Sequence, residues 1–432
     1  MNGEMKTMTQ KRALVLSIDA MTDLDLEVAR EYPHFSEILS HCAFATNVES
    51  VFPSLTYPCH VAMATGCAPM HTGIYNNEAF LPDTFRRPWY FYASQIARPT
   101  IFAFAAKAGI STGCVMWPCM GKGPIDTLVP EIWGETPDAP FLEPFCSAGS
   151  EAFIREIWPT VGEIAHGFHQ PEFDTFVCRI AEEVIRRRRP ELLYVHMCQI
   201  DNAKHYRGLN SPERIRAIEN TDALLGRLLA ALEQEGLRED THIVLCSDHG
   251  RMPVERVSYP NRLLAVHGLL AAGDGGAIPH WQAQVQSACL SAFVYAENAQ
   301  AERRALRLLQ ENSAALGIAQ ILPRAECPAQ FQLDGAFSAV LLGTPGTYFH
   351  NAADSGVLME RGEDGPLPYR ANHGHDPRLG EKPFFLISGR DAAVGARISH
   401  GFRLIDEAPT VAALMGFEMP GVDGQACTGL LR

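Results

Sequence analysis

Three pairs of side chains that commonly bind metals occur in the sequence: Asp201 with His205, Asp248 with His249, and His373 with His375. The first pair is spaced by four residues, so a helical turn would point both side chains to one side. The second pair occupies consecutive positions, and the third lies in a glycine-containing stretch typical of a loop. Mixed oxygen and nitrogen donors suit zinc better than magnesium, with manganese and iron as alternatives. Each pair alone is close to chance, but their coincidence predicts a divalent metal centre.

Apolar runs of strand length lead to the aspartates that would anchor such a site. The runs comprise residues 13–18, 192–200 and 241–247, and they end at Asp19, Asp201 and Asp248. Uninterrupted apolar runs are typical of strands buried on both faces of a parallel sheet. In open α/β sheets, ligands bind at the carboxyl ends of the strands. The three carboxylates are therefore expected to converge at one edge of the sheet.

The element order around these runs predicts an α/β fold. Ser211 and Pro212 begin a helix with regular apolar spacing, Gly236 ends it, and another helix is expected over about 171–189. Residues 256–370 differ, because they contain glycine-rich turns, short alternating segments and one further helix. We therefore predict a mostly parallel sheet flanked by helices on both faces, with a smaller inserted α+β cap.

Composition limits the classes of partner. The 432 residues carry a formal net charge of −14, with 47% hydrophobic and 20% charged residues, which is typical of a globular protein. The acidic balance argues against a nucleic-acid duplex, because binding to its phosphates needs clustered Lys and Arg. The uninterrupted uncharged run before Asp19, residues 13–18, has only six residues, so we expect no signal segment, and no later segment offers about 18 apolar residues. With twelve cysteines and no CxxC pair, we expect reduced thiols, no membrane association and a cytoplasmic location.

A candidate nucleophile lies between the first and second aspartates. Residues 60–65 are predicted to be helical and Gly66 to end the helix, which places Thr56 just before the helix start. Free backbone N–H groups and the helix dipole favour an anion there. A threonine hydroxyl is a poor nucleophile at neutral pH, but it can ionise when it binds a divalent cation. Without a metal, Thr56 would be interpreted as a helix cap.

Seven short motifs follow one another along the chain, at residues 17–19, 52–60, 64–66, 71–77, 201–205, 247–250 and 373–376. In this order they resemble the type I phosphodiesterase/nucleotide pyrophosphatase family of the alkaline phosphatase superfamily, over about residues 13–425. The resemblance implies an alkaline-phosphatase-like catalytic core, formed by 13–255 and 371–425, with the cap at 256–370. It also implies hydrolysis of phosphodiester or nucleotide pyrophosphate bonds in a small phosphorylated substrate.

The same resemblance implies roles for individual residues. Two divalent cations would be bound, one by Asp201, His205 and His373, and the other by Asp19, Asp248, His249 and the Thr56 oxygen. Thr56 would attack phosphorus and form a phosphothreonine intermediate. Asn77, together with the backbone N–H of the nucleophile, would contact a phosphoryl oxygen. His373 is preferred to His375 by its position in the motif, and His60 is interpreted as a packing residue.

Alternative functions remain within and outside this family. Phosphonoacetate hydrolase, which cleaves a C–P bond with nearly the same residues, would need a basic side chain for the substrate carboxylate; candidates are Lys122, Lys204, Arg207 and Arg251. His196 stands where many nucleotide-cleaving relatives carry an aromatic residue, which argues against a nucleotide preference. Sulfatases share the fold but need a Cys or Ser and an Arg where this chain has Thr56 and His60. A metal-stabilised binding protein without turnover is a further alternative.

Overall fold

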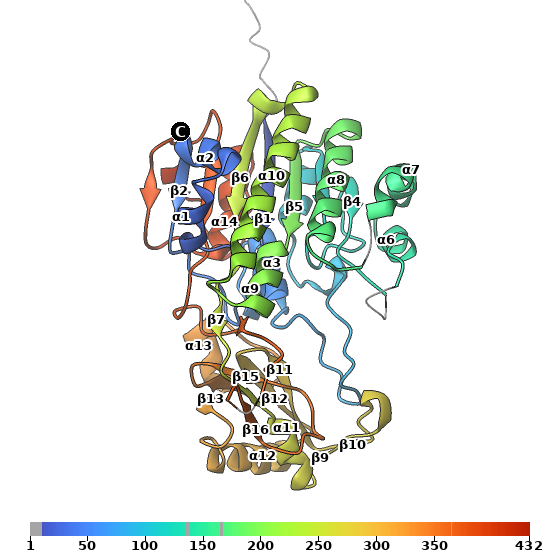
Figure 1. Cartoon of the computed structure of the whole chain (residues 1–432), viewed down its shortest axis with the longest axis vertical. Helices are drawn as coiled ribbons and strands as arrows, with labels where there is room; N and C mark the ends of the chain where they lie inside the picture. Colours follow the sequence, from blue (N-terminus) through green and yellow to red (C-terminus); the bar gives the residue numbers. More distant parts are fainter. Residues whose placement is uncertain (1–10, 135–138, 165–166, 364) are drawn as a thin grey trace, which may run out of the picture.

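Strand β1 (Arg12–Ile18) lies in the middle of an eight-stranded sheet in the computed structural model (Figure 1). It pairs in parallel with β5 (Leu192–Met197) on one side and β6 (Thr241–Cys246) on the other. The strand order is β19-β2-β18-β6-β1-β5-β3-β4, and β18 runs antiparallel to both of its neighbours. The remaining strands are β2 (Cys42–Ala45), β3 (Thr112–Val115), β4 (Thr127–Val129), β18 (Phe385–Ser388) and β19 (Arg397–Ile398). The predicted mostly parallel sheet is confirmed.

The structure describes residues 11–134, 139–164, 167–363 and 365–432. Part of the prediction about a leader segment concerns residues 1–10, which lie outside these ranges. Within them, no helix is both long enough and apolar enough to cross a membrane. All twelve cysteines are free thiols, as expected, and most of them are buried. The cytoplasmic location stays a prediction.

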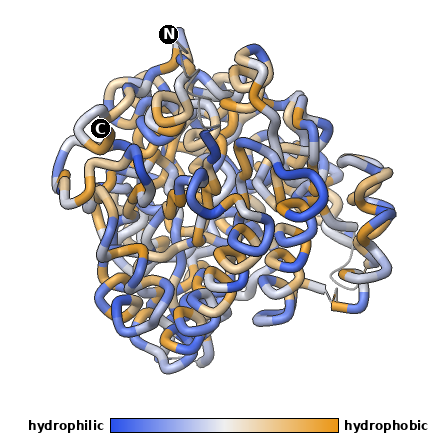
Figure 2. Tube along the Cα trace, turned by 90° about the horizontal axis from the view of Figure 1, so that it is seen from above, coloured by the Kyte–Doolittle hydropathy of each residue, from blue (hydrophilic) through white to orange (hydrophobic). Residues whose placement is uncertain are grey.

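Helices cover both faces of the sheet, and the alternation of β1 side chains shows why. Leu14 and Leu16 belong to one apolar core, which includes α8 and α10, whereas Ala13 and Val15 belong to another, which includes α3, α5 and α14. Their bounds are α3 (Thr56–Thr65), α5 (Ile101–Lys107), α8 (Glu172–Arg187), α10 (Pro212–Gln234) and α14 (Glu407–Met415). The first core also contains α1 (Asp23–Ala29), α2 (Pro33–Ser40), α6 (Leu142–Ala148) and α7 (Glu151–Val161). Seen from above, the outer helices alternate between hydrophobic and hydrophilic segments, as expected for helices packed on one side (Figure 2).

Two local predictions differ from the structure by a few residues. The strand before Asp201 ends at Met197, and α9 (Gln199–Arg207) begins there because the Asp174 carboxylate accepts hydrogen bonds from the backbone N–H groups of Cys198 (3.1 Å) and Gln199 (2.9 Å). Asp201 therefore stands on the first turn of a helix and not at a strand end. Helix α3 begins at Thr56 itself, four residues earlier than predicted. Pro58 fits its first turn, where no N–H is needed.

A second, antiparallel sheet of order β11-β12-β14-β13 lies beyond the end of the core that carries Asp19 and Asp248 (Figure 1). Its strands are β11 (Ala283–Ala288), β12 (Ser291–Ala296), β13 (Ile318–Pro323) and β14 (Ala339–Gly343). Beside it lie α11 (Pro260–Val266), α12 (Ala299–Glu311), α13 (Cys327–Phe331), and β8 (Arg256–Ser258) between β15 (Thr347–Phe349) and β16 (Met359–Arg361). We propose that residues 256–370 form a cap on a core made of 13–255 and 371–425.

Candidate active site

The metal-binding side chains predicted from the sequence meet at the edge of the core sheet that faces the cap. Two groups have ligand atoms within 4.8 Å of one another: Asp19, Asp248 and His249 in one, and Asp201, His249 and His373 in the other. We call these the Asp248 cluster and the Asp201 cluster. His249 belongs to both, whereas the resemblance assigned it to a single cation. His205 lies beside the Asp201 cluster, with its Nε2 3.5 Å from Asp201 Oδ2.

The Asp248 cluster is buried and short of positive charge. Asp248 Oδ1 accepts hydrogen bonds from the backbone N–H groups of Ala20 (3.1 Å) and His249 (2.9 Å), which aims Oδ2 at the His249 Nε2 atom 3.1 Å away. Burial raises the pKa of Asp248 to about 7. Burial and the neighbouring carboxylates of Asp201 and Asp248 raise the pKa of Asp19 well above its usual value. Two carboxylates in this position need a cation to stay ionised.

The Asp201 cluster is paired with a positively charged side chain of the protein, Arg251. The buried Arg251 guanidinium forms an ion pair with Asp201 and donates to the Ala371 carbonyl oxygen (3.2 Å). Burial alone would raise the pKa of Asp201, but Arg251 and His373 lower it to about 2. His205 Nδ1 donates to the same Ala371 carbonyl (3.2 Å), so its Nε2 is left to face Asp201. Such a bond fixes the tautomer of a metal-binding histidine.

Buried polar atoms without partners indicate that these residues fit divalent cations. Among the described residues, no hydrogen bond reaches Asp19 Oδ1, Asp248 Oδ2, His249 Nδ1 or His373 Nδ1, and the two carboxylate oxygens have only imidazole nitrogens nearby, such as His249 Nε2 at 3.5 and 3.1 Å. A buried oxygen or nitrogen without a partner costs about 1–3 kcal/mol, so several in one place call for a ligand. Carboxylate oxygens with imidazole nitrogens form a donor set that suits zinc, manganese or iron.

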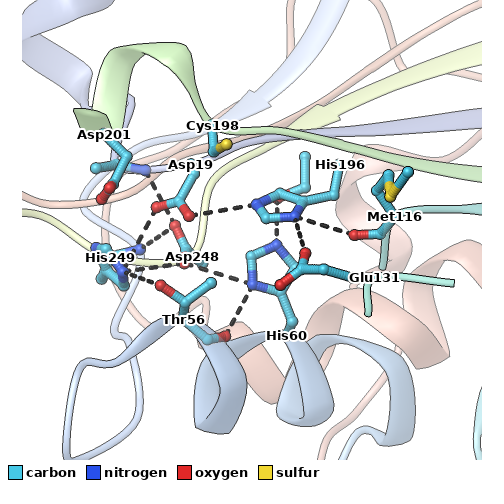
Figure 3. Close-up of polar contacts among 12 residues, drawn as sticks. Asp19, Thr56, His60, Met116, Glu131, His196, Cys198, Asp201, Asp248 and His249 are labelled. Carbon is cyan, nitrogen blue, oxygen red and sulfur yellow. Dashed lines mark hydrogen bonds and ion pairs between the residues drawn. The ribbon is translucent and has the colours of Figure 1, made fainter. Parts of the chain in front are cut away.

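Thr56 lies at the N-terminus of α3, next to the two clusters. It is the first residue of α3, and its hydroxyl oxygen lies 3.3 Å from His249 Nε2 (Figure 3). The next backbone N–H, of Tyr57, donates to Asn77 Oδ1 (3.0 Å), which brings the predicted Asn77 beside the predicted nucleophile. His60 lies one turn later, donates from Nδ1 to the Thr56 carbonyl (2.8 Å) and contacts Ser17 Oγ (2.9 Å). His60 is buried, which agrees with its interpretation as a packing residue.

Two residues that contact the Asp248 cluster or its neighbours were not recognised as such from the sequence: His196 and Glu131. His196 is buried in β5, with Nε2 3.3 Å from Asp19 Oδ2 and Nδ1 2.9 Å from Glu131 Oε2 (Figure 3). Burial alone would lower the pKa of His196, but Asp19 and Glu131 raise it well above its usual value. His196 therefore acts as a partner of Asp19 and does not line a base-binding slot. Glu131 carried no local signal, because it stands 65 residues away in an irregular segment.

The cap supports His373 directly. The β11–β12 turn donates the Leu290 N–H to the His373 carbonyl (3.0 Å), and Ser291 Oγ donates to the Gly374 carbonyl (2.7 Å). Gly374 has φ +81°, and a Cβ there would collide with the carbonyl oxygen of Ala288, so the close approach requires glycine. His375 belongs to neither cluster, and the sequence preference for His373 agrees with this placement.

Comparison with known proteins identifies the family. Residues 13–368 match the family described as type I phosphodiesterase/nucleotide pyrophosphatase. The chain belongs to this family. Every candidate site residue except His373 lies within the matched range. The identification agrees with the resemblance seen in the motifs.

Members of the type I phosphodiesterase/nucleotide pyrophosphatase family are similar to this chain over different lengths. Human ectonucleotide pyrophosphatase/phosphodiesterase family member 1 is 22% identical over 231 residues, covering 50% of this chain and 21% of that protein. An uncharacterized pyrophosphatase/phosphodiesterase of Schizosaccharomyces pombe is 24% identical over 226 residues, covering 49% of this chain and 38% of that protein. The chain therefore matches well under half of the length of these relatives.

A solved structure extends the likeness to the whole fold. Murine ectonucleotide pyrophosphatase/phosphodiesterase 5 superposes with a TM-score of 0.69 at 18% identity, covering 98% of this chain and 100% of that chain. The same protein as an inactive threonine-to-alanine variant in complex with AMP superposes with a TM-score of 0.70. The predicted fold class is thereby confirmed.

Proposed function

We propose that this chain is a metal-dependent hydrolase of phosphate esters, acting on phosphodiester or nucleotide pyrophosphate bonds, with Thr56 as the nucleophile. The observation that carries the proposal is the position of Thr56. It is the first residue of α3, and its hydroxyl oxygen lies 3.3 Å from Nε2 of His249, the histidine shared by both clusters. A helix N-terminus favours an anionic phosphoryl group, and the clusters supply carboxylates and imidazoles for cations beside it. Family membership supports the reaction class.

Two divalent cations, which we propose to be zinc, would be held by the candidate ligands. Asp201, His205 and His373 would hold one, and Asp19, Asp248, His249 and the Thr56 oxygen the other. Such cations lower the pKa of a bound hydroxyl and neutralise charge on the attacking and leaving oxygens. The unpartnered buried atoms of both clusters support this assignment.

The residues of this chain then divide the reaction into two displacements. The Thr56 hydroxyl gives up its proton to solvent, Oγ forms a bond to phosphorus while the bond to the leaving oxygen breaks, and the leaving oxygen takes up a proton from solvent. Water next forms a bond to phosphorus from the opposite side and loses a proton to solvent, while the bond to Thr56 Oγ breaks and that oxygen takes up a proton. Asn77 Oδ1 is held by the Tyr57 N–H (3.0 Å), which leaves its Nδ2 to donate to a phosphoryl oxygen. The inactive threonine variant of the murine relative supports a threonine nucleophile.

The placement of basic residues favours ester hydrolysis over C–P bond cleavage. Lys204 is buried in ion pairs with Asp25 (2.6 Å) and Glu381 (2.9 Å), and Arg251 is paired with Asp201. The exposed Lys122 packs over the Tyr92 ring. Three of the four candidates for a carboxylate-binding residue are thus engaged elsewhere, so no observation favours phosphonoacetate as the substrate.

The test is metal analysis combined with a substrate panel. The protein, loaded with zinc, manganese or iron in turn, is assayed with an aryl phosphodiester, an aryl phosphomonoester, a dinucleotide and phosphonoacetate. We expect two metals per chain and fastest turnover of a diester, and we expect a chelator to abolish it. Release of phosphate from phosphonoacetate without cleavage of any diester would overturn the proposal, as would diester cleavage that survives complete removal of the metals.

A further inference from the structure

A row of aromatic rings leads away from the nucleophile through the candidate site. The His249 and His373 rings stack at 4.3 Å between centroids, His373 lies 5.2 Å from His205, and His205 lies 5.1 Å from Tyr369. Thr56 contacts the first ring of this row, because its hydroxyl lies 3.3 Å from His249 Nε2. Tyr369 therefore marks the end of the site that is farthest along the row from Thr56.

Two more tyrosines widen that end into a wall. Tyr206 lies 5.8 Å and Tyr348 lies 5.3 Å from Tyr369, between ring centroids. Tyr206 belongs to α9 of the core, Tyr348 to β15, and Tyr369 to the segment that leads into β17 (Ala371–Asn372). We call these three residues the tyrosine wall. It brings together side chains from the core and from the cap segment, next to His205.

The wall is held in place and yet is open to solvent. The Arg370 N–H donates to the His205 carbonyl (2.7 Å), which ties the segment carrying Tyr369 to α9. Tyr348 and Tyr369 are partly buried, whereas Tyr206 is 52% exposed. The exposed Tyr206 packs on Tyr369, which in turn packs on Tyr348, and together they offer a preformed aromatic surface to a ligand.

The geometry of phosphoryl transfer says which part of a substrate would reach this wall. Attacking and leaving oxygens lie roughly in line on opposite sides of phosphorus. With Thr56 attacking from the His249 end of the row, the leaving oxygen points toward His205 and the group that it carries extends toward Tyr369. We propose that the tyrosine wall is a leaving-group subsite for a flat ring, either an aryl group or a nucleobase. This inference rests on the proposed function and names the substrate class that it would favour.

The wall is separate from the position that His196 occupies. His196 lies buried below Asp19, so it offers no ring to the substrate, whereas Tyr206 is on the surface beside His205. Stacking of a base on an aromatic side chain is worth roughly tenfold or more in binding, and it tolerates many kinds of ring. Selectivity for a ring in the leaving group is therefore the property to measure.

The test compares two methyl phosphodiesters whose leaving groups are similarly acidic alcohols. One carries phenyl and the other hexafluoroisopropyl, so only the first has a flat ring. We expect the ratio of kcat/KM, phenyl over hexafluoroisopropyl, to fall about tenfold in Tyr206→Ala and in Tyr369→Leu. Tyr206→Phe should restore the wild-type ratio, since it keeps the ring. Val266→Ala, at an apolar side chain that is 62% exposed on α11, is the control and should leave both rates unchanged.

The following outcomes would contradict the proposed leaving-group subsite. If the Tyr206 and Tyr369 variants slow both esters by the same factor, these residues are structural and the subsite is wrong. If neither variant moves the ratio, the leaving group lies elsewhere. Wild-type protein that cleaves neither ester when loaded with metal overturns the proposed function, and the subsite with it. That result is distinguishable because it requires no variant.

Discussion

The Asp201 cluster and the Asp248 cluster share His249 but differ in how the chain balances their charge. Asp201 is paired with the Arg251 guanidinium, a permanent cation that is itself buried. Among the described residues, Asp19 and Asp248 have only histidines as ion-pair partners: His196 beside Asp19, His60 beside Asp248, and His249 beside both. Burial lowers the pKa of His60 and of His249, so both stay neutral, and His196 is also bonded to Glu131. The pKa of Asp201 is accordingly lowered to about 2, whereas burial raises the pKa of Asp248 to about 7.

This difference indicates which cluster needs a cation most. The Asp201 cluster is electrostatically satisfied by protein groups, so a metal there must share Asp201 with a guanidinium. The Asp248 cluster holds buried carboxylates that stay charged at neutral pH only when positive charge arrives from outside the chain. Thr56 touches His249, which both clusters share, so the proposed nucleophile lies next to both of them.

The largest expected effect comes from removing the Thr56 hydroxyl. Thr56→Ala should reduce the turnover of an aryl diester by about 10³-fold or more, because the proposed covalent intermediate forms on this hydroxyl. Both metals should remain bound, since the carboxylates and imidazoles are unchanged. Steady-state kinetics with metal analysis on the same sample checks this. Thr56→Ser is the matched control and should retain measurable turnover. An alanine variant that keeps a tenth of wild-type activity would show that Thr56 is not the nucleophile.

Neutralising one carboxylate in each cluster should have opposite effects on the metal-free protein. At pH 7.5, Asp248→Asn should raise the free energy of unfolding by roughly 4 kcal/mol, because it removes a buried charge without a charged partner. Asp201→Asn should lower it by roughly 3 kcal/mol, because it leaves the Arg251 guanidinium buried without its carboxylate. Urea unfolding in the presence of a chelator measures both. Equal signs for the two variants would contradict the contrast between the clusters.

The strands and the identity of the ligands could be predicted from the sequence because both are local. Uninterrupted apolar runs indicated β1, β5 and β6, and each acid stands within a few residues of such a run. The start of α9 could not be predicted, because it depends on Asp174, a residue from another helix. Helix α3 begins at Thr56, four residues before the predicted start, and its first turn accommodates Pro58, because that turn needs no N–H at this position.

The charge balance of the site could not be predicted because it depends on long-range contacts. Arg251 follows the Asp248-His249 pair in sequence, yet its guanidinium neutralises Asp201, 50 residues away. Glu131 reaches His196 from a segment whose sequence showed no regular pattern. The support that the cap gives to His373 through Leu290 has no sequence signal either, since a backbone N–H makes the contact. Only the folded structure shows that Asp201, and not Asp19 or Asp248, is paired with an arginine.

The pH dependence of the metal-free protein offers a smaller test of the same contrast. The pKa of Asp248 rises from its ordinary 3.8 to about 7 on folding, so the folded state binds more protons and its stability falls as pH rises between these values. The loss should be about 2 kcal/mol between pH 5.5 and pH 7.5. Buried histidines with lowered pKa values, such as His205 and His373, give the opposite slope. The contribution of Asp248 is therefore the difference between wild type and Asp248→Asn, measured by urea unfolding at several pH values.

Asp201 provides the internal control for that measurement. The pKa of Asp201 is lowered to about 2, so its contribution to stability is complete above pH 4 and is lost only as pH falls through 2. The difference between wild type and Asp201→Asn should therefore be constant from pH 5.5 to pH 7.5. A difference that changes with pH for Asp201→Asn, and stays flat for Asp248→Asn, would reverse the assignment of the charge deficit.

The smallest expected effect comes from changing Glu131, which reaches the Asp248 cluster only through His196. Glu131 accepts from His196 Nδ1 (2.9 Å), and this bond directs the opposite Nε2 toward Asp19. Glu131→Gln keeps the shape but removes one negative charge near the cation, so zinc should bind the Asp248 cluster about tenfold more weakly. Competition with a chelator should show one site weakened and the other unchanged, because Arg251 and Asp201 lie outside this contact. Glu418→Gln, at an exposed carboxylate, is the control. If both sites weaken equally, the two clusters are electrostatically one unit and their contrast is lost.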